Sequence, residues 1–145
     1  MYREELTEIA KVIWESIVGL PLEPSESGQQ AAAADLVTVR VNVSGAWNGS
    51  VSATFSRNLG SMIASAMLQL DAEQLSSADV SDALLEVVNM LGGNFKALLP
   101  PVCHLSLPDL VTDPSQVPGT LEETAHFVCE HQPLDICVRK LSLAS

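Results

Sequence analysis

Positive charge is scarce in this sequence. Its 145 residues include 7 lysines and arginines against 18 aspartates and glutamates, which gives a formal net charge of −11. Such a chain has few cations with which to displace the counterions of a nucleic-acid backbone, and anionic lipid headgroups repel it. The charge balance therefore argues against nucleic acid and membrane surfaces as partners.

Long apolar runs are also absent. The longest stretch without a charged residue, Val41 to Ser56, alternates in polarity and contains Asn, Ser and Gly, whereas a membrane-spanning helix needs about 20 apolar residues. The first residues, Met1 to Glu5, lead directly into an amphipathic pattern and lack the basic start and apolar run of an export signal. We therefore expect no transmembrane segment and a cytoplasmic location.

Cysteine is limited to Cys103, Cys129 and Cys137, an odd number without the close spacing of metal ligands. Cys129 alternates in phase with the apolar Phe127, whereas Cys137 is out of phase with Ile136. If those apolar residues define one buried face, the two sulfur atoms point to opposite sides of a sheet. We expect reduced thiols and no disulfide.

Histidines are few and scattered, at His104, His126 and His131. Neither Cys103-His104 nor Cys129-x-His131 has the spacing of a zinc site, so we expect no bound metal. Ser106 and Ser142 lack a nearby base that could activate them as nucleophiles. Trp14 and Trp47 suit packing in the core and at a turn better than ligand stacking.

The composition contains enough apolar side chain for one sizeable core, since 47% of the residues are hydrophobic. A chain of this length removes roughly 68–70% of its surface from water on folding. We expect residues 1–145 to form a single domain.

Hydrophobic periodicity predicts the first half of the fold. An amphipathic helix over Glu4 to Val18 ends at Gly19-Leu20-Pro21, and Leu22 to Asp35 is typical of a loop. Strict alternation then predicts two strands joined as a hairpin, the first with Val37, Val39, Val41 and Val43, the second with Val51, Ala53 and Phe55.

Two further helices follow. Ser56 is placed to cap a helix that ends before Asp71, and Ser76 to Asp79 has the pattern of a capping box at the start of a long helix. This long helix is predicted to continue to Leu98, before Pro100-Pro101.

The C-terminal part has the composition of strands. They are predicted at Val102 to Leu107, Leu110 to Thr112, Glu123 to Glu130 and Leu134 to Ser142, the last two forming a hairpin across Gln132-Pro133. Helices grouped apart from antiparallel strands indicate an α+β fold: an antiparallel sheet with one long helix and two further helices.

The long helix has two different flanks. A core stripe is formed by Val80, Leu84, Val87, Val88, Leu91, Phe95 and Leu98, and the opposite flank by Asp79, Asp82, Glu86, Asn89 and Gly93. Glu86 and Asn89 are neighbours at i and i+3 on that opposite flank. Asn weakens a helix by several tenths of a kcal/mol and a glycine by roughly 1 kcal/mol, so stability alone disfavours Asn89, Gly92 and Gly93.

Two interpretations of this flank stand side by side. In the first interpretation, Gly92-Gly93 ends or kinks the helix and the acidic residues form a solvated face, where Asp79 and Asp82 stabilise the helix by interacting with its dipole. Alternatively, the small residues beside Asn89 lower the surface so that a partner can approach closely.

The stretch from Asp79 to Lys96 resembles the signature helix of the CheX, CheC and FliY chemotaxis phosphatases, and CheX most of all. That family has the motif Glu-x-x-Asn followed by a Gly-rich step, which here corresponds to Glu86, Asn89 and Gly92-Gly93-Asn94. The resemblance covers nearly the whole chain, because an opening helix ending in Gly-Leu-Pro, a hairpin with Gly in its turn and a Ser-started helix occur in the same order.

The resemblance implies an enzyme that hydrolyses the aspartyl phosphate of a response-regulator receiver domain. In that family the Asn is inserted into the receiver and orients the attacking water, and the Glu pairs with a receiver lysine; these roles fall on Asn89 and Glu86. An acyl phosphate is already labile, so positioning supplies much of the catalysis. The Mg²⁺ is expected on the receiver, so this chain needs no cofactor of its own.

The sequence departs from CheC-type relatives in one respect. They carry a second Glu-x-x-Asn on the first helix, but here Glu8 is followed at the Asn position by Lys11, which implies one site per chain. Gly92, Gly93 and Asn94 are assigned to clearance and helix geometry rather than chemistry. CheX-like proteins commonly join their sheets at exposed edges, so a homodimer is expected.

Two rival hypotheses remain at this stage. In the first, the chain is a non-catalytic module that binds a receiver or a second copy of itself. In the second, it is an unrelated α+β domain with a chance motif. The pair Glu86 and Asn89 favours the enzyme, because a pure binder has no need for a helix-weakening Asn at that position.

Overall fold

The computed structural model describes residues 2–26 and 35–141 of the chain. In this part, the elements are α1 (Arg3–Ile13), the π-helix η1 (Trp14–Val18), β1 (Glu23–Ser25), β2 (Leu36–Gly45), β3 (Gly49–Ser56), α2 (Arg57–Leu68), the 3-10 helix η3 (Ala72–Gln74), α3 (Ser77–Lys96), β4 (Cys103–Leu105), β5 (Asp109–Val111), the 3-10 helix η4 (Pro114–Gln116), β6 (Thr120–Cys129) and β7 (Gln132–Lys140).

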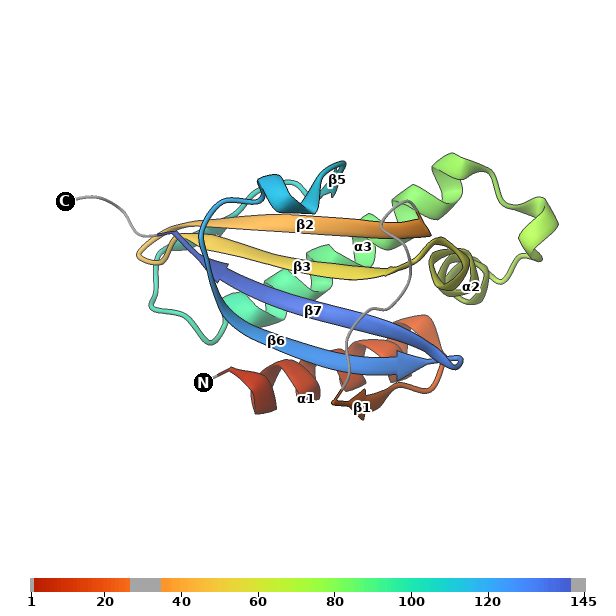
Figure 1. The fold of residues 1–145 in the computed structure, drawn as a ribbon, viewed down its shortest axis with the longest axis horizontal. Helices are drawn as coiled ribbons and strands as arrows, with labels where there is room; N and C mark the ends of the chain where they lie inside the picture. Colours follow the sequence, from red (N-terminus) through yellow and green to blue (C-terminus); the bar gives the residue numbers. More distant parts are fainter. Residues whose placement is uncertain (1, 27–34, 142–145) are drawn as a thin grey trace.

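The strands form one antiparallel sheet in the order β1-β6-β7-β3-β2-β4, with β5 also paired to β2. Helices α1 and α3 lie together behind the sheet, and α2 lies at one end of it (Figure 1). The predicted α+β fold is therefore confirmed. Within the described residues, no helix combines the length and the apolar character that crossing a membrane requires.

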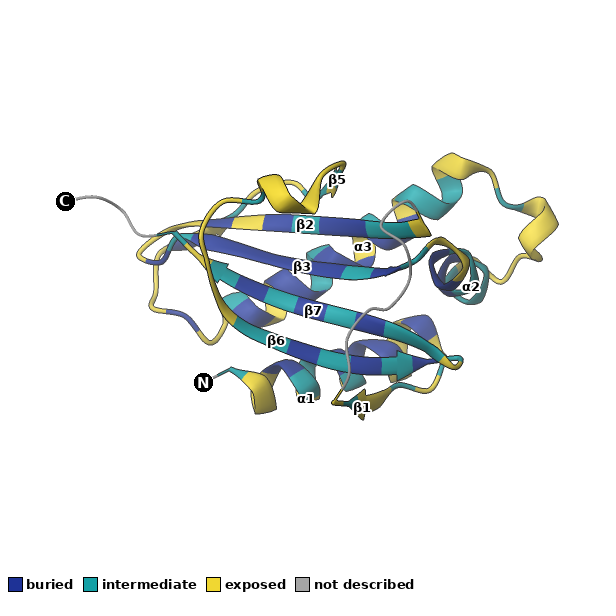
Figure 2. Ribbon diagram, in the orientation of Figure 1, coloured by how far each residue is buried: buried dark blue, intermediate teal, exposed yellow. Residues whose placement is uncertain are grey.

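The core lies between the helices and one face of the sheet. Val39, Val41 and Val43 on β2 are fully or almost fully buried there, as the alternation predicts, while Arg40 and Asn42 between them are more exposed. Buried and less buried positions alternate in the same way along β6 and β7 (Figure 2). The sheet thus has one apolar face under the helices and one face that is mainly polar.

The predicted hairpin of β2 and β3 is confirmed, with Val41 opposite Val51. Its turn is closed by Asn48, whose Oδ1 accepts from the Gly45 amide at 3.3 Å and whose Nδ2 donates to the Gly45 carbonyl at 3.0 Å. Gly45 has φ of 117°, a value that favours glycine.

The N-terminal segment differs from the prediction in two places. The predicted helix is present, but its last turn is the π-helix η1, and Gly19 ends it with φ of 78°. The segment from Leu22 was predicted as a loop, yet β1 pairs there with β6. A three-residue strand containing Pro24 is too short to show a two-residue period, which is why the sequence does not indicate it. Residues 27–34 of the predicted loop lie outside the described residues.

The hairpin of β6 and β7 is present, but its predicted turn at Gln132-Pro133 is wrong. The turn residues are Glu130 and His131, with φ of 49° and 65°, and Pro133 lies inside β7 opposite Val128. Two consecutive positive φ values match the twist of the strands, but such turns usually carry Asn-Gly or Asp-Gly. Since neither turn residue is a glycine, no local pattern marks this position.

Both predicted helix caps are present. The Ser56 Oγ accepts from the Leu59 amide at 3.0 Å at the start of α2. At the start of α3, the Ser76 Oγ accepts from the Asp79 amide and the Asp79 carboxylate accepts from the Ser76 amide, each at 3.0 Å. Both helices therefore begin where their capping residues predict.

The C-terminal end of α3 corrects the prediction. The helix continues straight through Gly92 and Gly93 and ends at Lys96, two residues before the predicted Leu98. Leu98 is consequently 42% exposed rather than part of the core stripe, and Leu99 is buried instead.

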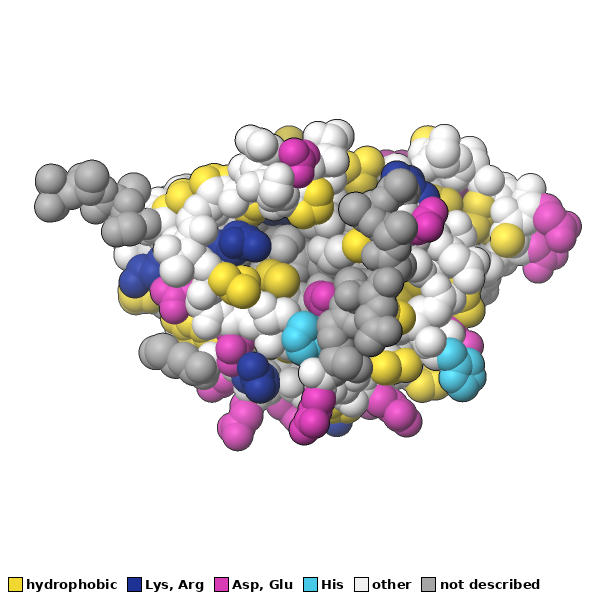
Figure 3. Space-filling model, viewed as in Figure 1, with side chains coloured by type: hydrophobic (Ala, Val, Ile, Leu, Met, Phe, Trp, Pro, Cys, Tyr) yellow, Lys and Arg dark blue, Asp and Glu magenta, His cyan; other side chains and the backbone are white. Residues whose placement is uncertain are grey.

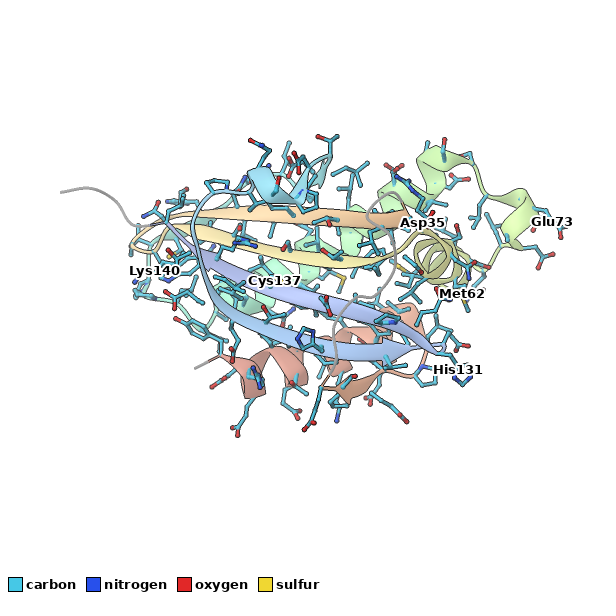
Figure 4. All side chains as sticks on the ribbon, in the orientation of Figure 1. Asp35, Met62, Glu73, His131, Cys137 and Lys140 are labelled. Carbon is cyan, nitrogen blue, oxygen red and sulfur yellow. The ribbon has the colours of Figure 1, made fainter. Side chains whose placement is uncertain are left out.

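The cysteines and tryptophans behave as predicted. All three thiols are free; Cys103 and Cys129 are buried, and Cys137 is partly exposed on the polar face of the sheet (Figure 4). Trp14 is fully buried, and the ring of Trp47 packs edge-on against Phe95 with 5.8 Å between ring centroids.

Candidate functional site

Helix α3 is held by its apolar flank. The side chains that it buries against the sheet and the neighbouring helices are Leu84, Val87, Val88, Leu91 and Phe95. Gly92 lies on the same flank, where a Cβ would stand 2.4 Å from Val41 Cγ1 on β2. The missing side chain lets the helix approach the strand closely, and this contact fixes the rotation of α3 about its axis.

The opposite flank carries the predicted site. Glu86 and Gly93 are exposed and Asn89 is partly exposed, so Glu86 and Asn89 occupy successive turns on the outward side of the helix. This side faces away from the sheet, and hence away from the viewer in Figure 1. The structure therefore brings the two predicted residues together at a surface where a partner can reach both.

The functional groups of this pair are not used by the fold. Within residues 2–26 and 35–141, the structure shows no hydrogen bond or ion pair that involves the side chain of Glu86 or Asn89. Asn94 provides the contrast, because its Nδ2 donates to the Met90 carbonyl of its own helix at 2.9 Å. The carboxylate of Glu86 and the carboxamide of Asn89 are thus available to another molecule.

The surroundings of the site are acidic. Helix α1 packs beside α3 and exposes Glu4, Glu5 and Glu8 against the cations Arg3 and Lys11, while α3 exposes Asp82 near Glu86 and has one cation, Lys96, at its end, so carboxylates outnumber cations. Acidic side chains also gather along the lower edge in Figure 3, where α1 lies. A surface of this charge favours a partner that presents basic groups.

The second motif of CheC-type relatives has no functional equivalent on α1. Glu8 is exposed, and Lys11, at the position of the Asn, is partly buried. An ammonium group donates hydrogen bonds and cannot accept one from water, so Lys11 cannot orient water as a carboxamide does.

Metal-ligand types do not cluster in the described part of the chain, where no group of three or more His, Cys, Asp and Glu side chains is placed to hold a metal ion. His104 and His131 are exposed, the latter at the β6–β7 turn (Figure 4). His126 instead pairs with Asp135 across β6 and β7, with 2.7 Å between Nδ1 and Oδ1. Sequence reasoning missed this pair because it depends on the strand register.

A groove of about 410 Å³ was also not predicted. It lies where the start of α3 meets α2 and β5, and its lining includes Arg57, Ser61, Leu75, Val80 and Leu110. Neither Glu86 nor Asn89 contributes to it. The groove also includes residues of β2 and η3, and only the fold brings β2 and β5 against the segment from α2 to α3, so no local pattern indicates it.

The thiols are not arranged for nucleophilic chemistry. Burial raises the pKa of the Cys129 thiol and also that of the Cys137 thiol above the usual value. Both are therefore protonated near neutral pH, and the thiolate is the reactive form.

Comparison with solved structures gives the same fold in chemotaxis proteins. The CheX protein of Vibrio vulnificus is similar with a TM-score of 0.73 and 19% identity over 95% of each chain. CheX in the CheX–CheY–BeF3–Mg²⁺ complex of Borrelia burgdorferi gives a TM-score of 0.74 and 15% identity over 98% of this chain and 99% of that one. FliY of Thermotoga maritima gives 0.56 and 16% over 95% and 89%.

Comparison by sequence gives different results for single proteins and for protein families. No curated protein matches the chain significantly. The family described as chemotaxis phosphatase CheX matches residues 37–129, a range that contains the whole of α3. Since this match spans more than half of the chain, the protein belongs to the CheX family of chemotaxis phosphatases.

Proposed function

We propose that residues 1–145 act as one domain that hydrolyses the aspartyl phosphate of a CheY-like receiver domain. The observation that carries the proposal is the pair Glu86 and Asn89, whose side chains are one turn apart, outward-facing and without a partner among the described residues of the chain. Membership of the CheX family and the likeness to a CheX solved with CheY support the same substrate class.

Asn89 supplies the catalytic group. Its carboxamide donates a hydrogen bond through the amide nitrogen and accepts one through the carbonyl oxygen. It can therefore contact a phosphoryl oxygen and hold a water molecule in line with phosphorus at the same time. A carboxylate, which only accepts and is repelled by phosphate, cannot replace it. The water attacks phosphorus, the bond to the receiver's aspartate oxygen breaks, and the aspartate leaves as a carboxylate.

Glu86 binds the receiver through the negative charge of its carboxylate. It is exposed on the same flank, one turn before Asn89, so a receiver that contacts one residue also meets the other. Pairing of its carboxylate with a receiver lysine fixes the orientation in which Asn89 enters the receiver. The surrounding acidic side chains assist the approach of this lysine by long-range attraction.

The Mg²⁺ belongs to the receiver in this proposal. The chain's own contribution is to position water and to exclude other geometries, which is a large part of catalysis when the leaving group is a carboxylate and the phosphoryl group is already activated. No cofactor of its own is required.

The protein is also proposed to form a homodimer. Among the described residues, the short strand β1 pairs with β6 at Val128, Phe127 and His126, so β1 itself does not extend along the earlier part of the outer edge of β6. An edge of this kind offers N–H and C=O groups to a strand of a second copy.

The direct test is the decay of a phosphorylated CheY-like receiver from the same organism, measured with and without this protein. Accelerated release of inorganic phosphate supports the phosphatase. An unchanged decay rate together with stable binding would instead support the non-catalytic receiver-binding module.

A further inference from the structure

The two adjacent glycines of α3 have different environments. A Cβ on Gly92 would stand 2.4 Å from Val41 Cγ1 and 3.7 Å from Leu105 Cδ2, so the packing of the helix on the sheet requires glycine there. A Cβ on Gly93 would meet no atom within 4 Å. The fold therefore gives a steric reason for the first glycine and none for the second.

The backbone does not require glycine at position 93 either. Gly93 lies inside α3, which continues to Lys96, and positive φ values in the described part of the chain occur at other glycines, namely Gly19, Gly45 and Gly119. An exposed helical position of this kind is more stable with alanine, because glycine loses more backbone freedom on folding. The glycine at 93 thus carries a cost in stability that nothing within the described structure explains.

The position of Gly93 relative to the site supplies the explanation. It stands seven residues after Glu86 and four after Asn89, so all three lie along one outward flank. Side chains in a helix tilt toward its N-terminus. A side chain at position 93 would therefore extend over the turn that carries Asn89 and raise the surface next to that residue.

The space left open at position 93 matters because the side chain of Asn89 is short. The carboxamide of Asn89 is separated from the helix backbone by a single CH₂ group, so it reaches a group buried in a partner only when that partner lies almost against the helix. Gly92 cannot provide this clearance, because it faces Val41 on the inner flank.

We infer that Gly93 is a docking position: its missing side chain lets the backbone of the receiver approach α3 closely enough for Asn89 to enter the phosphorylation site. This inference rests on the proposed function and assigns Gly93 a positioning role without contact to the reacting atoms. Any side chain at position 93 holds the receiver away from the helix, and a larger one does so more strongly.

The test uses Gly93→Ala and Gly93→Leu in the full chain. Gly93→Ala should raise the melting temperature by about 3 °C, because alanine is the better helix former at an exposed position. The same variant should nevertheless raise the KM for the phosphorylated receiver, and Gly93→Leu should raise it further, by roughly tenfold, as expected for loss of a well-packed contact. For Gly93→Ala, kcat should stay close to the wild-type value since Asn89 is intact.

Ala78→Leu is the matched control. Ala78 is exposed on the same helix, 15 residues before Gly93, or about 22 Å along the axis. Adding leucine there should leave the KM unchanged. A general effect of an added apolar side chain, which would contradict the inference, would appear in both leucine variants.

The outcomes separate the two proposals. If the wild type accelerates dephosphorylation and Gly93→Leu has the wild-type KM, the docking role of Gly93 is wrong and the phosphatase stands. If the wild type neither binds a beryllofluoride-loaded receiver nor accelerates dephosphorylation, the proposed function is wrong, and the role of Gly93 falls with it. Weaker binding of the beryllofluoride-loaded receiver by Gly93→Leu than by wild type supports the docking role independently of turnover.

Discussion

Gly92 on α3 and Val41 on β2 are in such close contact that a Cβ on the glycine would stand 2.4 Å from Val41 Cγ1. Val41 is fully buried in the middle of the sheet, and its branched side chain has little rotational freedom. The contact holds one flank of α3 against the sheet, and it thereby directs the opposite flank, with Glu86 and Asn89, to the outside.

The first prediction concerns this contact. Gly92→Ala should lower the free energy of unfolding by about 1 kcal/mol, since overpacking at so close a contact costs about 2 kcal/mol and the gain in helix propensity offsets about 1 kcal/mol of it. Urea denaturation measures the change. Stability equal to or above that of the wild type would show that Val41 moves aside freely, and the contact would then not fix the helix.

The second prediction concerns Glu86. Glu86→Ala should weaken activity mainly by raising the KM for the receiver, so the loss should shrink as the receiver concentration rises. Added salt should weaken the wild-type complex and affect the variant less, because exposed ion pairs are screened.

Asp82→Ala is the control for Glu86→Ala. Asp82 is an exposed carboxylate on the same flank, one turn before Glu86. Its removal should change stability by at most a few tenths of a kcal/mol, because Asp82 lies past the first turn of α3. It should leave kcat unchanged and raise the KM much less than Glu86→Ala does. An equal rise in KM for both variants would mean that only the general acidity of the surface matters, and the specific role of Glu86 would be wrong.

The third prediction concerns assembly. Light scattering at tens of micromolar should give about twice the chain mass of 15.4 kDa, because edge pairing of two sheets joins two copies. A mass near 15.4 kDa at that concentration would contradict the homodimer.

Features that depend on neighbouring residues could be predicted from the sequence. The β2–β3 hairpin follows from strict alternation, and the starts of α2 and α3 follow from Ser56 and from Ser76 with Asp79. The period of α3 placed Glu86 and Asn89 on its outward flank, and the family resemblance gave that pair its expected chemistry. Each of these signals lies within a few residues of the feature it predicts.

Features that depend on distant contacts could not be predicted. Gly92 and Gly93 are the same residue type side by side in the sequence, and only the packing on Val41 distinguishes their environments. The His126–Asp135 pair requires the register of β6 and β7. One local feature was missed for a different reason: the turn at Glu130-His131 has the right backbone conformation without the glycine that usually signals it.

The carboxamide of Asn89 is proposed to orient the attacking water, and the decisive experiment is the decay of a phosphorylated CheY-like receiver in the presence of Asn89→Ala. The variant should fold and be slightly more stable than the wild type, because alanine is a better helix former than asparagine by several tenths of a kcal/mol. Its melting temperature therefore serves as the internal control. Asn89→Ala should nearly abolish accelerated dephosphorylation, even at saturating receiver. Full activity of Asn89→Ala would contradict the catalytic assignment.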